Sequence, residues 1–137
     1  MNAGFPRSSR LLRGSDFERV MRLGRKAYSP NLIVFTSPND LEHPRLGLAV
    51  GRRVGHAACR NRWKRLIREV FRLHLQHRLP PIDIVVAVRA AEGRVRKGRA
   101  SPTEKLPMRK ASGLASVKTE LINAIKRVAA FQSISKE

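Results

Sequence analysis

The sequence predicts a single α/β domain, residues 1–137, in which strands alternate with amphipathic helices. Two observations support this prediction. Apolar residues alternate or run continuously over 31–37, 45–51 and 82–90, which is typical of strands. Between the second and third of these segments the apolar period lengthens to that of a helix, over 57–78. A chain of 137 residues is long enough for one modest core.

The first third of the chain predicts an arm, a short helix and a pair of strands. Residues 1–13 are basic and contain Gly, Pro and Ser, so we expect a flexible basic arm. Ser15 is expected to cap a short helix that stops at Gly24. The turn residues PNDLEHP separate the strands 31–37 and 45–51, which favours an antiparallel pair.

The remaining chain predicts a crossover and a final helix. A strand, the helix 57–78 and a second strand in succession favour a parallel pair. Residues 24–29 are a candidate for a short further strand. Residues 92–113 are rich in Arg, Lys, Gly, Pro and Ser without a sustained period, so we expect a mobile basic loop. An amphipathic helix is expected over 116–131.

The charge balance indicates a polyanionic partner. The chain has 29 Lys and Arg against 10 Asp and Glu, a formal net charge of +19. Nucleic acid is the leading partner class and an anionic membrane surface the second. No apolar run approaches the ~20 residues that span a bilayer, and no signal peptide is recognisable. With a single cysteine, these features predict a cytoplasmic protein without a membrane partner.

The segment CRNRWKRLIREVFR, Cys59–Arg72, carries the clearest functional signal. Six of its fourteen residues are Arg or Lys and one is acidic. On a helical wheel the cations cover most of one side, and like charges spaced i, i+4 repel each other. Contact with phosphates explains such a one-sign face, and a solvated charged face is the alternative. The apolar side is expected to consist of Trp63, Leu66, Ile67, Val70 and Leu73, with Phe71 at its margin.

The stretch before this helix carries Gly51 and Gly55 around Arg52 and Arg53. Glycines at a helix start allow an anion to approach the backbone closely, but they are equally typical of simple turns. The nucleophilic and titratable residues do not form a catalytic site. His56 and Cys59 are three residues apart, but Cys59 is expected to pack as a small apolar residue. The acidic residues are scattered along the chain. The sequence therefore predicts binding rather than catalysis by this chain.

At these residues the chain resembles the protein subunit of bacterial ribonuclease P. The matching run is Arg52-Arg53, Gly55, Arg60-Asn61-Arg62, Lys64-Arg65 and Arg68, closing on Phe71. DFERVMRLG resembles the family's first helix and NLIVFTS its first long strand, and the similarity covers about residues 9–90. The resemblance implies an α+β sandwich: a small mixed sheet of about four strands packed with three helices, with a left-handed βαβ crossover.

The resemblance also implies a function. The chain would be a monomer bound one-to-one to the catalytic RNA of ribonuclease P, an endonuclease that removes the 5′ leader of precursor tRNA. The RNA with its bound Mg²⁺ would perform the hydrolysis, with no catalytic residue, metal or cofactor on this chain. The family's Arg-Asn-Arg helix faces the catalytic RNA. By position, RNA binding is expected of Arg52, Arg53, Arg60, Asn61, Arg62, Lys64, Arg65 and Arg68.

The family holds the leader with aromatic residues on the sheet and first helix. Phe17 and Phe35 match two such positions, and Met21 stands at a third, where it stacks less well than an aromatic ring. Without the resemblance, core packing is the favoured interpretation of both phenylalanines. The loop 92–113 is longer than is usual in the family and adds either nonspecific RNA affinity or a spacer.

Two other classes of function compete with this one. A ribosomal or general RNA-binding protein would share the charge and the basic helix but would have no processing role. A DNA-binding regulator would insert the same helix into a major groove, but the helix lacks the short partner helix of a helix-turn-helix.

Overall fold

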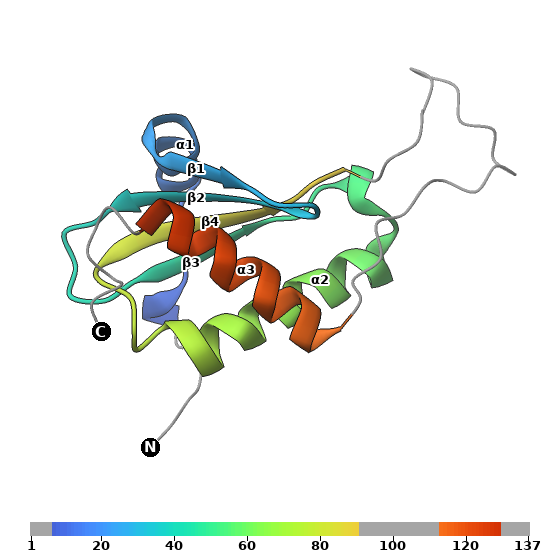
Figure 1. The fold of residues 1–137 in the computed structure, drawn as a ribbon. Coiled ribbons are helices and arrows are strands. Elements are labelled where there is room, and N and C mark those ends of the chain that lie inside the picture. The colour runs from blue at the N-terminus through green and yellow to red at the C-terminus, as the bar shows by residue number, and fades with distance from the viewer. Residues whose placement is uncertain (1–6, 91–112, 130–137) are drawn as a thin grey trace, which may run out of the picture.

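The computed structural model describes residues 7–90 and 113–129. In this part of the chain four strands form one sheet (Figure 1): β1 Arg25–Tyr28, β2 Leu32–Pro38, β3 Arg45–Ala49 and β4 Ile82–Val88. The α-helices are α1 Gly14–Leu23, α2 Ala57–Val70 and α3 Leu114–Ala129. Shorter helical segments are η1 Arg7–Ser9, η2 Arg52–Val54 and the π-helical η3 Phe71–Leu75. The α+β fold with a mixed sheet is therefore confirmed.

The strand order is β1-β2-β4-β3. Strand β2 runs antiparallel to β1 and to β4, and β3 runs parallel to β4. The parallel pair joined by α2 is therefore confirmed, and the candidate strand 24–29 exists as β1. The antiparallel pair predicted for 31–37 and 45–51 is wrong, because β4 lies between β2 and β3. An almost wholly apolar strand such as β4 is best buried at the centre of a sheet, where both edges and both faces are covered.

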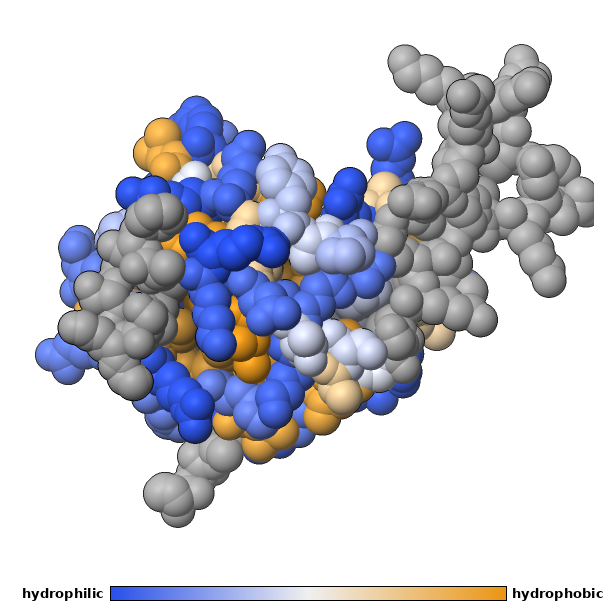
Figure 2. All heavy atoms as spheres, in the orientation of Figure 1, coloured by the Kyte–Doolittle hydropathy of each residue, from blue (hydrophilic) through white to orange (hydrophobic). Residues whose placement is uncertain are grey.

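The two faces of the sheet carry different layers (Figure 1). Along β4, Ile84 and Val86 belong to the core beneath α2 and α3, whereas Val85 belongs to a smaller core with α1. The main core includes Trp63 of α2 and Leu121 of α3, both almost completely buried. Because the two cores lie on opposite faces, α1 occupies the opposite face of the sheet from α2 and α3. Figure 2 shows the side of α2 and α3 covered largely by hydrophilic side chains, with apolar residues exposed in smaller patches.

The long central helix changes its geometry near its end. The N–H of Gln76 donates to the carbonyl of Phe71 at 2.8 Å, an i→i+5 bond typical of a π-helix. A π turn holds more residues than an α turn, so it rotates the residues that follow. Leu75 is consequently buried, like Phe71 at the start of the turn, whereas Leu73 is 46% exposed. The prediction that Leu73 belongs to the apolar side is wrong for this reason.

Helix α1 begins earlier than predicted. Its N-cap is Arg13, which makes no side-chain capping bond, and Ser15 lies exposed in the first turn instead of capping the helix. Gly24 does end the helix, as predicted. A Cβ on Gly24 would come within 2.4 Å of the carbonyl oxygens of Val20 and Thr36, so close backbone approach requires glycine here.

The described part of the predicted flexible arm is docked on the sheet. Arg10 forms a parallel bridge with Leu46 of β3, and the N–H of Leu11 donates to the Leu46 carbonyl at 2.9 Å. The Leu11 side chain is only 4% exposed. Because β3 is an edge strand with unpaired backbone groups, an adjoining segment gains hydrogen bonds by covering it. Residues 1–6 of the arm and 92–112 of the predicted basic loop lie outside the described residues.

Candidate nucleic-acid interface

The basic residues singled out in the sequence lie on the outer side of η2 and α2. Cys59, Trp63, Ile67 and Val70 point into the core and Leu66 packs against it, whereas the basic positions of the helix face outward. We call the outward-facing set the basic face: Arg52, Arg53, Arg60, Asn61, Arg62, Lys64, Arg65 and Arg68. Arg60 and Lys64 are half-buried and the other members are exposed. Glu69, the acidic residue of α2, forms an ion pair with Arg72, which lies outside the basic face.

Turn geometry accounts for one of the glycines that bracket Arg52 and Arg53. Gly55 has φ 152°, a conformation that side-chain-bearing residues rarely adopt. It separates η2 from α2 and so lets the chain change direction just before the basic helix. Gly51 has φ −88° and open space where a Cβ would stand, so its backbone places no such demand.

The His56–Cys59 pair serves to start the helix. The backbone N–H of Cys59 donates to Nδ1 of His56 at 3.3 Å, which is an N-cap interaction. The Cys59 thiol is buried and lies 3.9 Å from the carbonyl of Val54. One ring nitrogen of His56 is thus bound to the backbone N–H of Cys59. Within residues 7–90 and 113–129, no three His, Cys, Asp or Glu side chains lie where they could hold a metal ion, and no helix is long and apolar enough to cross a bilayer.

A second candidate surface lies on the α1 side of the sheet. The structure brings Phe17, Met21 and Phe35 together there, in a cluster with the buried residues Val20 and Val85. Phe17 and Met21 remain partly exposed, whereas Phe35 is only 7% exposed and offers little ring surface. The three residues expected to bind the leader therefore share one site, with Phe35 as its support.

The strand register arranges this face in rows that cross the sheet. One row carries Tyr28, Ile33, Ala87 and Ala49, one residue from each strand. The next row carries Lys26, Phe35, Val85 and Gly47, and the third carries Ser37, Asp83 and Arg45. Tyr28 is 56% exposed, and the other three residues of its row are half-buried. We call this first row the open row.

Tyr28 and Lys26 of β1 were not among the predicted site residues. Lys26 places its Nζ 5.9 Å from the centroid of the Phe35 ring, within cation–π range. The signal that points to them is the two-residue alternation of RKAY, which puts Lys26 and Tyr28 on one face and Ala27 on the other. Only the pairing of β1 with β2 shows that this face is the α1 side of the sheet.

Phe17 lies directly on the backbone of β3. A Cβ added to Gly47 would stand 2.7 Å from Cζ of Phe17 and 3.0 Å from Cβ of Leu11. Glycine at this point of the strand therefore lets the aromatic ring approach the sheet more closely than any other residue would.

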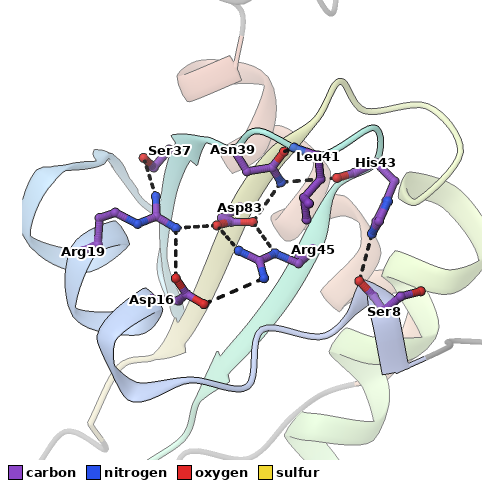
Figure 3. A network of polar contacts seen from close by, with 9 residues as sticks. All are labelled: Ser8, Asp16, Arg19, Ser37, Asn39, Leu41, His43, Arg45 and Asp83. Atoms are coloured by element: carbon purple, nitrogen blue, oxygen red, sulfur yellow. Dashed lines mark hydrogen bonds and ion pairs between the residues drawn. The ribbon is translucent and has the colours of Figure 1, made fainter.

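The third row is polar and ties α1 to the sheet (Figure 3). Arg45 donates to both carboxylate oxygens of Asp83, from Nε at 2.8 Å and from Nη2 at 2.7 Å. Arg19 of α1 donates to Asp83 Oδ2 at 2.6 Å, and Asn39 donates to Oδ1 at 2.9 Å. Asp16 lies 3.5 Å from Arg19 and 3.8 Å from Arg45. We call these five residues the Asp83 network.

The Asp83 network alters the ionisation of its members. Burial by itself would raise the pKa of Asp83, but the hydrogen bonds from Arg45, Asn39 and Arg19 outweigh burial and lower it. The pKa values of Arg19 and Arg45 are raised, in each case chiefly by the hydrogen bond to Asp83. The network therefore holds one ionised carboxylate between two charged guanidinium groups.

Comparison with known proteins decides the family. The family model described as Ribonuclease P matches residues 5–101, which is well over half of the chain. The chain belongs to the ribonuclease P protein family. The ribonuclease P protein component of Photorhabdus laumondii is 49% identical over 86 residues, covering 62% of this chain and 71% of that protein. The corresponding protein of Photobacterium profundum is 47% identical over 83 residues, covering 60% and 70%.

Solved structures of ribonuclease P proteins share the fold. The protein from Staphylococcus aureus is 27% identical, with a TM-score of 0.67 over 87% of this chain and 94% of that chain. The protein from Thermotoga maritima is 28% identical, with a TM-score of 0.65 over 87% and 96%. These likenesses support a subunit of ribonuclease P with a role in tRNA processing. They favour it over a ribosomal or general RNA-binding protein.

Proposed function

We propose that this ribonuclease P protein binds the catalytic RNA through the basic face and holds the 5′ leader of precursor tRNA on the α1 side of the sheet. Family membership supports the assembly, and the fold supports a division of labour. Helices α2 and α1 pack on opposite faces of the sheet, so two RNA segments can be held without competing for one surface.

The basic face suits a folded RNA because most of its cations are exposed and all its charges are of one sign. Arg52, Arg53, Arg65 and Arg68 are all exposed. Guanidinium groups donate in pairs to phosphate oxygens, so arginines fit an RNA backbone better than point charges do. Contacts between arginine side chains and RNA phosphates bind RNA without reading its sequence.

The α1 side of the sheet suits an unpaired strand. Phe17 and Met21 stand beside the open row, and Tyr28 of that row is well exposed. Stacking on aromatic side chains tolerates any base, as a leader of variable sequence requires. Lys26 adds a cation on the same face for the leader phosphates.

We place the hydrolysis on the RNA and its Mg²⁺. The polar row on the α1 side supports this placement, because Asp83 is completely buried and Asp83 and Asp16 both pair with arginines. Mg²⁺ held by RNA would activate water and stabilise the leaving oxygen. In this proposal the protein is a monomer bound one-to-one to the RNA in the cytoplasm, and its residues bind and orient the substrate.

Cleavage of a precursor tRNA by ribonuclease P RNA at low Mg²⁺, with and without this protein, tests the proposal. We expect release of the leader only when the protein is present, and none from the protein alone. Tight binding of RNA without any stimulation of cleavage would contradict it. Cleavage by the protein alone would move the catalytic centre onto this chain.

A further inference from the structure

Asp83 is a charged residue on a strand whose other residues are apolar. Its side chain is completely buried between α1 and the sheet, in line with the apolar residues Val85 and Ala87 of the same strand. Removing a carboxylate from water is costly, and buried ion pairs are often replaceable by apolar residues without loss of stability. A gain in stability therefore does not explain why a carboxylate stands at this buried position. The directed hydrogen bonds that it accepts do explain it.

Those bonds reach Asp83 from separate elements (Figure 3). Arg45 belongs to the neighbouring strand β3, whereas Arg19 comes from α1, 64 positions earlier in the sequence. Arg19 also lies 3.4 Å from the hydroxyl of Ser37 on β2. A second link joins α1 to β3, from Asp16 to Arg45 at 3.8 Å. Helix α1 is thus attached by polar contacts to three strands of the sheet.

The same turn of α1 carries the proposed leader contact. Phe17 lies between Asp16 and Arg19 in the sequence, and its ring rests on Gly47, two residues beyond Arg45 on the same face of β3. Apolar contacts are non-directional and allow a helix to slide or turn on a sheet. Arg19 instead donates from Nη2 to Asp83 and from Nη1 to Ser37, and such directed, charge-assisted hydrogen bonds favour one position of the helix on the sheet.

We infer that the Asp83 network positions α1 on the sheet so that Phe17 and Met21 stand beside the open row, where an unpaired leader base stacks. Asp16, Arg19 and Asp83 are on this account positioning residues for leader recognition. They act through Phe17 and Met21 and need not touch RNA. The inference rests on the proposed leader site.

A charge-neutral double variant tests the inference. Asp16→Asn with Arg19→Gln cuts both links from α1 while the net charge of the protein stays the same. The quantity to measure is the leader preference, defined as the affinity of the holoenzyme for leader-bearing precursor tRNA divided by its affinity for mature tRNA. We expect this ratio to fall about fivefold, the lower end of what the loss of one stacked base costs. Binding of the catalytic RNA and the circular dichroism spectrum should not change.

The matched control is Glu18→Gln with Arg22→Gln. Both residues are exposed on α1 and outside the Asp83 network, and the pair of changes is again charge-neutral. This control should keep the full leader preference. An equal fall in the control would show that α1 acts through its surface charges, and the inference would be overturned.

A graded variant covers the case in which the double variant does not fold. Arg19→Lys keeps the charge but cannot reach Asp83, Asp16 and Ser37 together, so an intermediate leader preference is expected. An unchanged preference in the double variant, or in Arg19→Lys where only that variant folds, would overturn the positioning role. Parallel loss of catalytic-RNA binding would also overturn it, since the network would then support the whole fold. A wild-type holoenzyme without leader preference would refute the proposed leader site itself.

Discussion

Burial and hydrogen bonding act in opposite directions on the carboxyl group of Asp83. Burial alone favours the neutral form, but three donors and two positive charges favour the carboxylate, and the pKa lies below its ordinary value of 3.8. A group whose pKa is lowered by folding stabilises the folded state above its unfolded pKa. That contribution is lost as the pH falls through the lower, folded pKa.

Comparison of the wild type with Asp83→Asn at different pH values tests this residue-scale argument. At neutral pH we expect the variant to be less stable by about 2 kcal/mol, because charged hydrogen bonds are lost. The difference should persist down to the ordinary pKa of Asp and shrink below it, as Asp83 becomes protonated in the wild type. Arg19 and Arg45 stay charged throughout, and Asp16 is present in both proteins. Urea unfolding followed by circular dichroism measures the difference, and a constant difference at all pH values would refute the linkage.

Phe17 is the residue through which the leader site can be tested directly. Phe17→Ala should weaken binding of leader-bearing precursor tRNA by roughly 1–3 kcal/mol, the cost of one lost stacking contact, and leave mature tRNA unaffected. Leu23→Ala is the control, because Leu23 lies on the same helix and is 72% exposed. Equal losses of affinity for precursor and mature tRNA would show that the role of Phe17 is purely structural.

At the scale of elements, α2 divides its two tasks between its sides. Residues spaced three and four apart, from Cys59 through Ile67 to Val70, hold the helix on the main core. The positions between them are left for the basic face. The π turn at Phe71–Leu75 then ends the regular pattern and turns Leu73 outward.

The double variant Arg65→Ala with Arg68→Ala tests the basic face. Both side chains are exposed, so the fold should be retained. We expect weaker binding of the catalytic RNA and a salt dependence whose logarithmic slope falls by about 2, one unit for each lost phosphate contact. Arg78→Ala with Lys126→Ala removes the same charge from exposed positions outside the basic face. If both double variants lose affinity equally, binding depends on net charge and not on this face.

At the scale of the whole molecule, the net charge and the sheet serve different purposes. A net charge of +19 attracts any RNA and does not distinguish a precursor from a mature tRNA. Discrimination is expected from the α1 side of the sheet, where stacking depends little on salt.

Raising the salt concentration should therefore separate the two effects. We expect the affinity of the holoenzyme for precursor and for mature tRNA to fall steeply and in parallel, because phosphate contacts release counterions. The leader preference should fall much less, since it depends mainly on stacking and only Lys26 adds a phosphate contact to the leader. Titration of both RNAs at several salt concentrations measures the ratio. A leader preference that disappears with salt would mean that the leader is held by charge alone.

The local pattern of the chain was sufficient for much of the fold. Periodicity predicted α2, the strands β2, β3 and β4, and the parallel pair joined by α2, because these depend on residues near one another in sequence. The basic face was also predictable, since a helical wheel needs only the order of residues. Its residues face outward, with Arg60 and Lys64 half-buried, and its RNA contacts remain a prediction.

Pairing between distant segments was not predictable in the same way. The turn residues after β2 suggested that β3 lay beside it, but β4 was inserted between them, because the most apolar strand gains most from a central place. The segment around Leu11 looked like a free arm because the open edge of β3 that it covers exists only in the folded sheet.

By itself the sequence determined which segments are helical or extended, the polyanionic partner class and the one-sign helix face, because these follow from composition and local period. Only the tertiary structure decided which residues share the α1 side of the sheet. The open row takes one residue from each of four strands, and Asp83 meets Arg19 across 64 positions. Such neighbours are set by strand order and register, which arise when non-local segments pack together and the whole core competes for burial.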